Sequence, residues 1–148
     1  MLTRDVQQQM TAAMRARDTA RRDALRLLIA AFQNARIAAG HELSDEEATR
    51  VLQREAKQRR ESITEYERAR REDLAGRERE ELRIIEGFLP RPLTEPELTD
   101  LARQVVAEVG ASSPGDLGRV MRPLMERVAG RADGRRANEI VRGLLGGA

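Results

Sequence analysis

Several residue types are absent from this chain or nearly so, and each absence excludes a class of chemistry. The 148 residues include no cysteine and no tryptophan, so disulfide bonds and thiolate catalysis are excluded. His41 is the sole histidine, and beside Gly40 at a predicted helix end we interpret it as a cap rather than a base. Metal and nucleophile sites therefore lack their usual components. We expect no catalytic residue, metal site or cofactor.

Long hydrophobic runs are also missing. No segment approaches 18 apolar residues, and no N-terminal apolar run precedes a small-residue cleavage site. Neither a membrane span nor a signal peptide is expected, so the sequence favours a cytoplasmic protein. Aromatic residues make up 2% of the chain and charged residues 35%, a composition typical of exposed helices whose cores use aliphatic side chains.

The C-terminal part is predicted to form three helices of roughly 12 to 16 residues, a small bundle with short connections. Each predicted helix has an apolar stripe at i, i+3, i+4 and i+7 spacing. The ends of these helices are predicted from residues that favour helix starts and stops. These signals are the capping box Thr94–Glu97, the stop at Gly110, the Ser113-Pro114 start with Asp116, the stop at Gly130 and the cap Asp133.

Pro123 lies inside the second of these stripes. It removes a backbone hydrogen bond to the carbonyl of Arg119 and crowds that turn. The sequence therefore predicts a kink that would displace Arg119 and Arg122.

The N-terminal part is also predicted to be helical. One helix is expected from a Thr3 cap to about Arg17, and a second from Asp18 to Gly40. The capping box at Ser44 opens a long helix that is expected to continue to about Asp73, roughly 29 residues or 43 Å. A break is expected around Gly76, after which the apolar pattern resumes up to Pro90.

Three prolines, Pro90, Pro92 and Pro96, predict a stiff linker. We therefore expect an N-terminal helical domain over residues 1–89 and a C-terminal bundle over residues 90–148. The fold class is predicted to be all-α, and glycine and proline positions give strands little support.

Four short motifs lie along the chain: Lys57 to Ile63, Phe88-Leu89-Pro90 with Leu93-Thr94, Val109 to Pro114, and Gly130 to Gly134 with Asn138. With these motifs the chain resembles the YqeY-like (GatB/YqeY) family over nearly its whole length. The resemblance implies an all-helical protein whose C-terminal bundle is similar to the tail of the B subunit of tRNA-dependent amidotransferases. It further implies contact with tRNA, which that tail delivers to a catalytic core elsewhere.

The distribution of charge adds a separate observation. The formal net charge is only +2, but residues 114–148 hold seven arginines against four acids, and residues 15–26 show a similar excess. Every basic residue except Lys57 is an arginine, which suits bidentate phosphate contacts.

Two groups of cations are candidates for RNA binding. Because so few residues are aromatic, any contact should be to backbone and shape rather than to stacked bases. The alternative is that these arginines only solubilise a small bundle, and that Arg59 packs its stem on the core and pairs with an acid of another helix. The candidates are Arg131, Arg135 and Arg136 around the last turn, Arg119 and Arg122 before it, and Lys57 and Arg60 in the first half.

Three functions are compatible with these observations. The favoured one is a non-catalytic tRNA-binding accessory protein that acts with amidotransferase subunits or an aminoacyl-tRNA synthetase. The second is a protein-interaction scaffold built on the long Ser44–Asp73 helix, without RNA. The third, implied by the family resemblance alone, is a component of glutamine-dependent amidation, a carbon–nitrogen ligase reaction.

Overall fold

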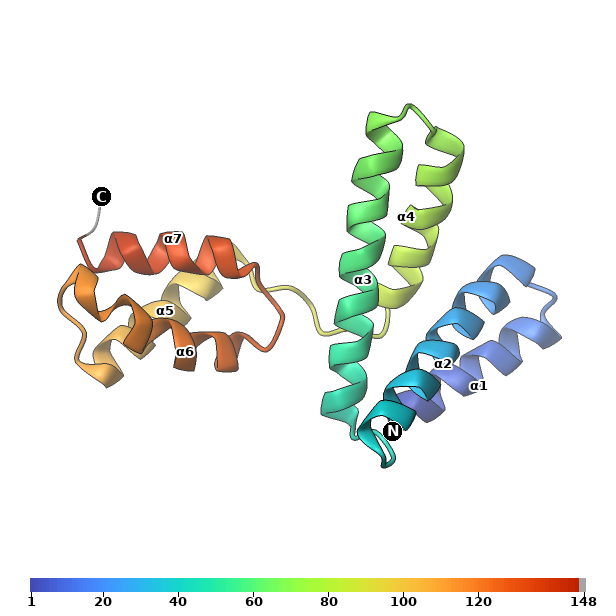
Figure 1. Ribbon diagram of the computed structural model, residues 1–148, viewed down its shortest axis with the longest axis horizontal. Coiled ribbons are helices and arrows are strands. Elements are labelled where there is room, and N and C mark those ends of the chain that lie inside the picture. Colours follow the sequence, from blue (N-terminus) through green and yellow to red (C-terminus); the bar gives the residue numbers. More distant parts are fainter. Residues whose placement is uncertain (147–148) are drawn as a thin grey trace. The chain divides into compact units, whose positions relative to one another are not determined.

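The computed structural model describes residues 1–146, which form seven α-helices and one short 3-10 helix and contain no strand (Figure 1). The all-α prediction is confirmed. The chain divides into two compact units, Met1–Leu89 (unit 1) and Pro90–Ala148 (unit 2). Each unit has its own hydrophobic core.

Unit 1 consists of two helical hairpins. Helices α1 (Leu2–Arg15) and α2 (Thr19–Ala39) form the first hairpin, and α3 (Asp45–Arg68) and α4 (Glu72–Glu86) form the second (Figure 1). Their shared core is aliphatic, and its largest fully buried side chains include Leu25, Leu28, Leu52 and Ile85. Burial of these apolar faces drives the packing of helices that would be marginal alone.

Several predicted caps of unit 1 are confirmed. The Ser44 hydroxyl accepts from the Glu47 amide at 3.1 Å, and the Glu47 carboxylate accepts from the Ser44 amide at 3.1 Å. Gly40 ends α2 with a φ of 76°. The Thr3 cap is wrong, because α1 begins at Leu2, whose amide donates to Asp45 Oδ1 at 2.9 Å. A carboxylate distant in the sequence thus replaces the local cap.

The predicted end of the long helix is also wrong. Helix α3 ends at Arg68, and the break lies at Ala69–Arg71 rather than at Gly76, which is inside α4. Ala75 is fully buried in α4. Because a glycine in a helix costs only about 1 kcal/mol, packing of the neighbouring alanine outweighs the local preference.

Arg59 lies where α3 and α4 meet, and its side chain is only 13% exposed. Its guanidinium donates to Glu55 at 2.7 Å and to Glu81 of the other helix at 2.9 Å. The expected pairing with an acid from another helix is confirmed. Burial lowers the pKa of Arg59, but the hydrogen bonds and the two carboxylates more than offset that effect.

Glu78 is the third carboxylate of this cluster. Its Oε2 lies 3.7 Å from Arg59 Nε, and this oxygen is buried without a hydrogen-bond partner. Burial, followed by repulsion from Glu81, raises the pKa of Glu78 despite the attraction of Arg59. One guanidinium therefore neutralises only part of the negative charge around it.

Unit 2 packs α5 (Glu95–Val109), α6 (Leu117–Val128) and α7 (Gly134–Leu144) around a second aliphatic core. The capping box at Thr94, the stop at Gly110 with a φ of 66° and the cap Asp133 are confirmed. Helix α6 continues through Pro123.

The predicted start and stop residues of α6 are confirmed, with one addition at each end. Ser113 is the N-cap and Pro114 the first residue of a 3-10 turn, Pro114–Asp116, that leads into the helix, and the Asp116 carboxylate accepts from the Ser112 and Ser113 amides. At the other end Ala129 takes up the left-handed conformation first, with a φ of 50°, and Gly130 follows with a φ of 80°. The two-residue left-handed turn is favoured because it brings the Arg131 amide to the Val128 carbonyl at 3.0 Å.

Replacement of Arg59 by alanine should lower the free energy of unfolding by about 2 kcal/mol, because three partly buried carboxylates lose their shared cation. Arg83, on the same hairpin, is the matched control: its side chain is 78% exposed beside Glu80, and its replacement should cost less than about 0.5 kcal/mol. Urea unfolding measures both. Equal losses would contradict the role given to Arg59.

Glu78→Gln should stabilise the protein at pH 7 by up to about 1 kcal/mol, because it removes a partly buried charge that Arg59 offsets only in part. The folded pKa of Glu78 lies above its ordinary value of 4.5. The protonated carboxyl therefore makes its full contribution to the free energy of unfolding below pH 4.5, and this contribution is lost as the pH rises through the folded pKa. The gain in the free energy of unfolding of the glutamine variant should therefore vanish below pH 4.5. Urea unfolding at a series of pH values measures this. Glu80→Gln is the control, and a gain that does not depend on pH would refute the assignment.

Candidate nucleic-acid interface

Arg131 is held by the start of unit 2. Its Nε donates to the carbonyl oxygen of Arg91 at 2.8 Å, and its own carbonyl accepts from the Leu93 amide at 2.8 Å. These two bonds fix the proline-containing segment 91–93 against the turn between α6 and α7. The side chain therefore has a structural task besides any contact with a ligand.

Arg136 is paired with two carboxylates. It donates through Nε to Glu95 at 2.6 Å and through a terminal nitrogen to Glu139 at 2.8 Å. The hydrogen bonds to Glu95 and Glu139 raise the pKa of Arg136, and the bond to Arg136 lowers the pKa of Glu95. Arg136 thus joins α7 to the first residue of α5, and its charge is balanced locally.

Arg119 is held in a similar way. It donates to Asp116 at 2.9 Å and to the carbonyl oxygen of Val109 at the end of α5. Hydrogen bonds from the Ser112 and Ser113 amides, together with Arg119, lower the pKa of Asp116. Three of the five arginines predicted in this unit therefore have partners within it.

Arg122 and Arg135 are the other two, and both are exposed. Their side chains form no hydrogen bond or ion pair with any residue in the range 1–146. Since successive residues of an α-helix are rotated by about 100°, each of the two arginines lies on the side of its helix opposite the buried residues. These two guanidiniums are free to bind an anion without breaking a bond inside the protein.

One further cation of unit 2 was missed from the sequence. Arg142 is exposed and lacks a partner within the part of the chain that the structure describes. It lies seven residues after Arg135, so the two share one face of α7 about 10.5 Å apart along the axis. The i, i+7 spacing is the signal that identifies it.

In unit 1 the two predicted cations differ. Arg60 lies 3.9 Å from Glu86 of α4, whereas Lys57 is exposed and has no partner among the described residues. Arg54, which no sequence pattern indicated, is likewise exposed and without a partner among the described residues. An i, i+3 spacing places Arg54 and Lys57 on one outward face of α3.

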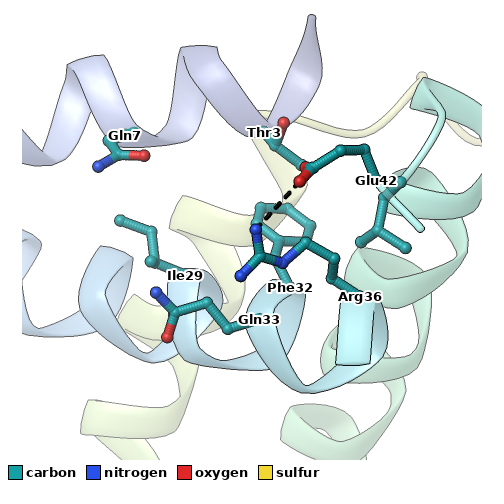
Figure 2. Close-up of a pocket in the computed structure, with 8 residues that line it drawn as sticks. Thr3, Gln7, Ile29, Phe32, Gln33, Arg36 and Glu42 are labelled. Atoms are coloured by element: carbon teal, nitrogen blue, oxygen red, sulfur yellow. Dashed lines mark hydrogen bonds and ion pairs between the residues drawn. The ribbon is translucent and has the colours of Figure 1, made fainter. Parts of the chain in front are cut away.

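Unit 1 also contains a small open cavity of about 180 Å³. Figure 2 shows Thr3 and Gln7 of α1 facing Phe32 and Gln33 of α2 across it. An ion pair of 3.0 Å between Arg36 and Glu42 closes one side. The lining offers amide, hydroxyl and apolar groups but no nucleophile with an adjacent base.

The described residues also lack two other kinds of site. Within residues 1–146, no group of three or more histidine or acidic side chains is placed to hold a metal ion. No helix in that range combines the length and the apolar composition that crossing a bilayer requires.

Arg131→Ala should destabilise unit 2 by about 1 kcal/mol, because the side-chain hydrogen bond that holds segment 91–93 is lost. Arg135→Ala, which removes the same charge four residues away, should change the stability by less than about 0.5 kcal/mol. Thermal unfolding compares the two variants. If both were neutral, the Arg131–Arg91 bond would not contribute to the fold.

A comparison with curated proteins finds no match. A family model described as "Yqey-like protein" matches residues 3–145. That match covers both helical units and nearly all of the chain. The chain therefore belongs to the YqeY-like family.

Proposed function

We propose that this chain is a non-catalytic tRNA-binding accessory protein. Its membership of the YqeY-like family supports this proposal through the similarity of that family to the amidotransferase B-subunit tail. The distribution of cations supports it through the chemistry of phosphate recognition.

The observation that carries the proposal is a set of exposed cations without internal partners on outward helix faces. Guanidinium groups match the geometry of phosphate oxygens, and each contact releases a counterion from the nucleic acid. Such contacts recognise the backbone of a folded RNA. The set includes Arg54 and Lys57 on α3, Arg122 on α6, and Arg135 and Arg142 on α7, none of which has a bonded partner within residues 1–146.

The aromatic residues favour the same mode of binding. Phe32 is 5% exposed in the core of unit 1, and Phe88 packs against that core. Tyr66, at the end of α3, is half-buried. Stacking of successive bases needs exposed aromatic faces, so we expect shape and phosphate contacts to dominate.

The remaining candidates are ranked below these five cations. Arg119, Arg131 and Arg136 each have hydrogen bonds within unit 2, and Arg60 lies near Glu86. To bind phosphate they must exchange or share those bonds. Each of these four arginines should therefore contribute less to RNA affinity than each of those five cations without partners.

The proposed role extends to a partner. A protein that binds tRNA without catalytic groups of its own would present the tRNA to an enzyme. Amidotransferase subunits or an aminoacyl-tRNA synthetase are the proposed partners. Glutamine-dependent amidation, a carbon–nitrogen ligase reaction, would then occur at the partner's active site.

A protein-interaction scaffold without RNA binding is the second candidate, and one observation favours it. Leu27 and Ile37 on α2 are 50% and 74% exposed, and residues 27–35, between Arg26 and Arg36, carry no charge. In a chain with 35% charged residues, exposed apolar side chains beside an uncharged segment favour a protein contact. This feature lies on α2 rather than on the long helix α3.

The tRNA-binding proposal predicts a specific salt dependence. Arg122→Ala with Arg135→Ala should weaken tRNA binding at low salt and lower the slope of log affinity against log salt by about 1.5, at roughly 0.7 to 0.9 for each phosphate contact. Filter binding or fluorescence anisotropy over a salt series measures both quantities.

The matched control removes Arg103 and Arg127, which belong to the same unit but pair with Asp100 and Glu108. It should leave the slope unchanged. If the unaltered protein has no affinity for tRNA at low salt, the proposal is wrong. Recovery of protein partners but no RNA from cells would then favour the scaffold.

A further inference from the structure

Helices α1 and α3 end in the same unusual way. The residue after each C-cap is an arginine in the left-handed conformation, Arg17 with a φ of 58° and Arg70 with a φ of 56°. At the first tip the Arg17 amide donates to Met14 at 3.2 Å and the Asp18 amide to Ala13 at 2.9 Å. This pair of backbone bonds is the Schellman motif.

The second tip repeats the pattern bond for bond. The Arg70 amide donates to the Glu67 carbonyl at 3.1 Å, and the Arg71 amide donates to the Tyr66 carbonyl at 2.8 Å. Both hairpins of unit 1 thus turn on an arginine at the position where glycine is usual.

The chain uses glycine in this conformation elsewhere. Gly40 ends α2 and Gly110 ends α5, with φ values of 76° and 66°. A residue with a Cβ atom is strained there. Ala129 shows that strain alone indicates no ligand, since it has a φ of 50° and no charge.

The side chains distinguish the two arginines from Ala129. Arg17 and Arg70 are exposed, and neither guanidinium has a hydrogen bond or ion pair within the described part of the chain. Each has a second free arginine nearby in the sequence, Arg15 and Arg77 respectively. Each tip therefore presents one guanidinium without an acidic partner.

The neighbouring arginines are different. Around the tips, Arg22 pairs with Asp23, Arg68 with Glu65, and Arg71 with Asp73. Arg21 donates to Gln9. Acidic or amide partners are thus available near both turns, yet the strained arginines do not use them.

Figure 1 shows both tips at hairpin ends that lie away from the connection between α2 and α3. The turn residues 16–18 and 69–71 include no apolar side chain larger than alanine. This composition favours contact with phosphates over insertion into a bilayer.

We propose that the two hairpin tips of unit 1 are two further phosphate contacts for an RNA backbone, made by Arg17 and Arg70. This proposal rests on the proposed function and adds contacts outside unit 2. At the left-handed position beyond the last helical turn, each guanidinium can reach a phosphate without losing an internal bond. Retention of arginine where glycine would relieve strain is then explained by binding.

The test replaces both residues by glycine, Arg17→Gly with Arg70→Gly. Glycine suits the left-handed conformation, so the melting temperature should be unchanged or higher. The affinity for unfractionated tRNA and for a short RNA duplex should fall about tenfold at low salt. The slope against salt should fall by about 1.5, at roughly 0.7 to 0.9 for each contact.

Two control variants isolate the charge at the tips. Arg17→Lys with Arg70→Lys keeps both the charge and the strain, and should keep most of the slope. Arg36→Ala with Arg83→Ala removes two arginines of unit 1 that pair with Glu42 and Glu80, and should leave the slope unchanged.

The outcomes separate this proposal from the proposed function. If the glycine variant binds both RNAs like the unaltered protein, while removal of Arg122 and Arg135 weakens tRNA binding, the tips do not bind RNA but the proposed function stands. If the duplex binds through the tips and tRNA does not bind at all, the proposed function fails alone. If neither RNA binds the unaltered protein, both proposals are overturned.

Two further results would also overturn the role of the tips. A lower melting temperature of the glycine variant, with unchanged RNA binding, would mean that the arginines serve the negative ends of α1 and α3. Loss of binding to vesicles containing 30% phosphatidylserine, with unchanged RNA binding, would assign the tips to a membrane surface instead.

Discussion

Close packing between short side chains is the constraint on which both units depend. With aromatic residues at 2% of the chain, the cores are filled by aliphatic residues, and alanines lie at the helix contacts. Ala48, Ala56, Ala75, Ala102 and Ala137 are all fully buried. Small side chains let helices approach closely, and charged groups at the edges of such contacts lose water. Those groups must therefore find partners inside the protein, as the cluster around the α3–α4 contact does.

This requirement divides the arginines into two populations. Those beside a core or a connecting segment are held by carboxylates or carbonyl groups, as Arg59 and Arg131 are. Among those on outward helix faces and hairpin tips, some have no such partner within residues 1–146, as Arg135 and Arg17 illustrate. Composition alone cannot separate the two populations, because both consist of the same residue type. Their difference arises from which acids the fold brings within reach.

The sequence predicted the features that depend on local chemistry. Capping boxes such as that of Ser44 and stops such as Gly110 were correct, since each involves residues only three or four positions apart. The end of α3 was missed because Arg70 in a left-handed turn leaves no local signal, and because buried Ala75 holds Gly76 in a helix. Which arginines are held depends on contacts across about 40 residues, such as that between Arg131 and Arg91, and helical periodicity does not reveal these.

The modest net charge limits how such a protein can bind RNA. At +2 overall, the molecule has little long-range attraction for a polyanion, and acids next to the basic residues screen it further. The proposed binding would therefore have to come from several short-range contacts made together. Free guanidiniums on rigid helices suit this mode, because each one loses no internal bond on binding. Under the proposed function, such binding would be weak and reversible at physiological salt, which would suit a component that passes its RNA to a partner enzyme.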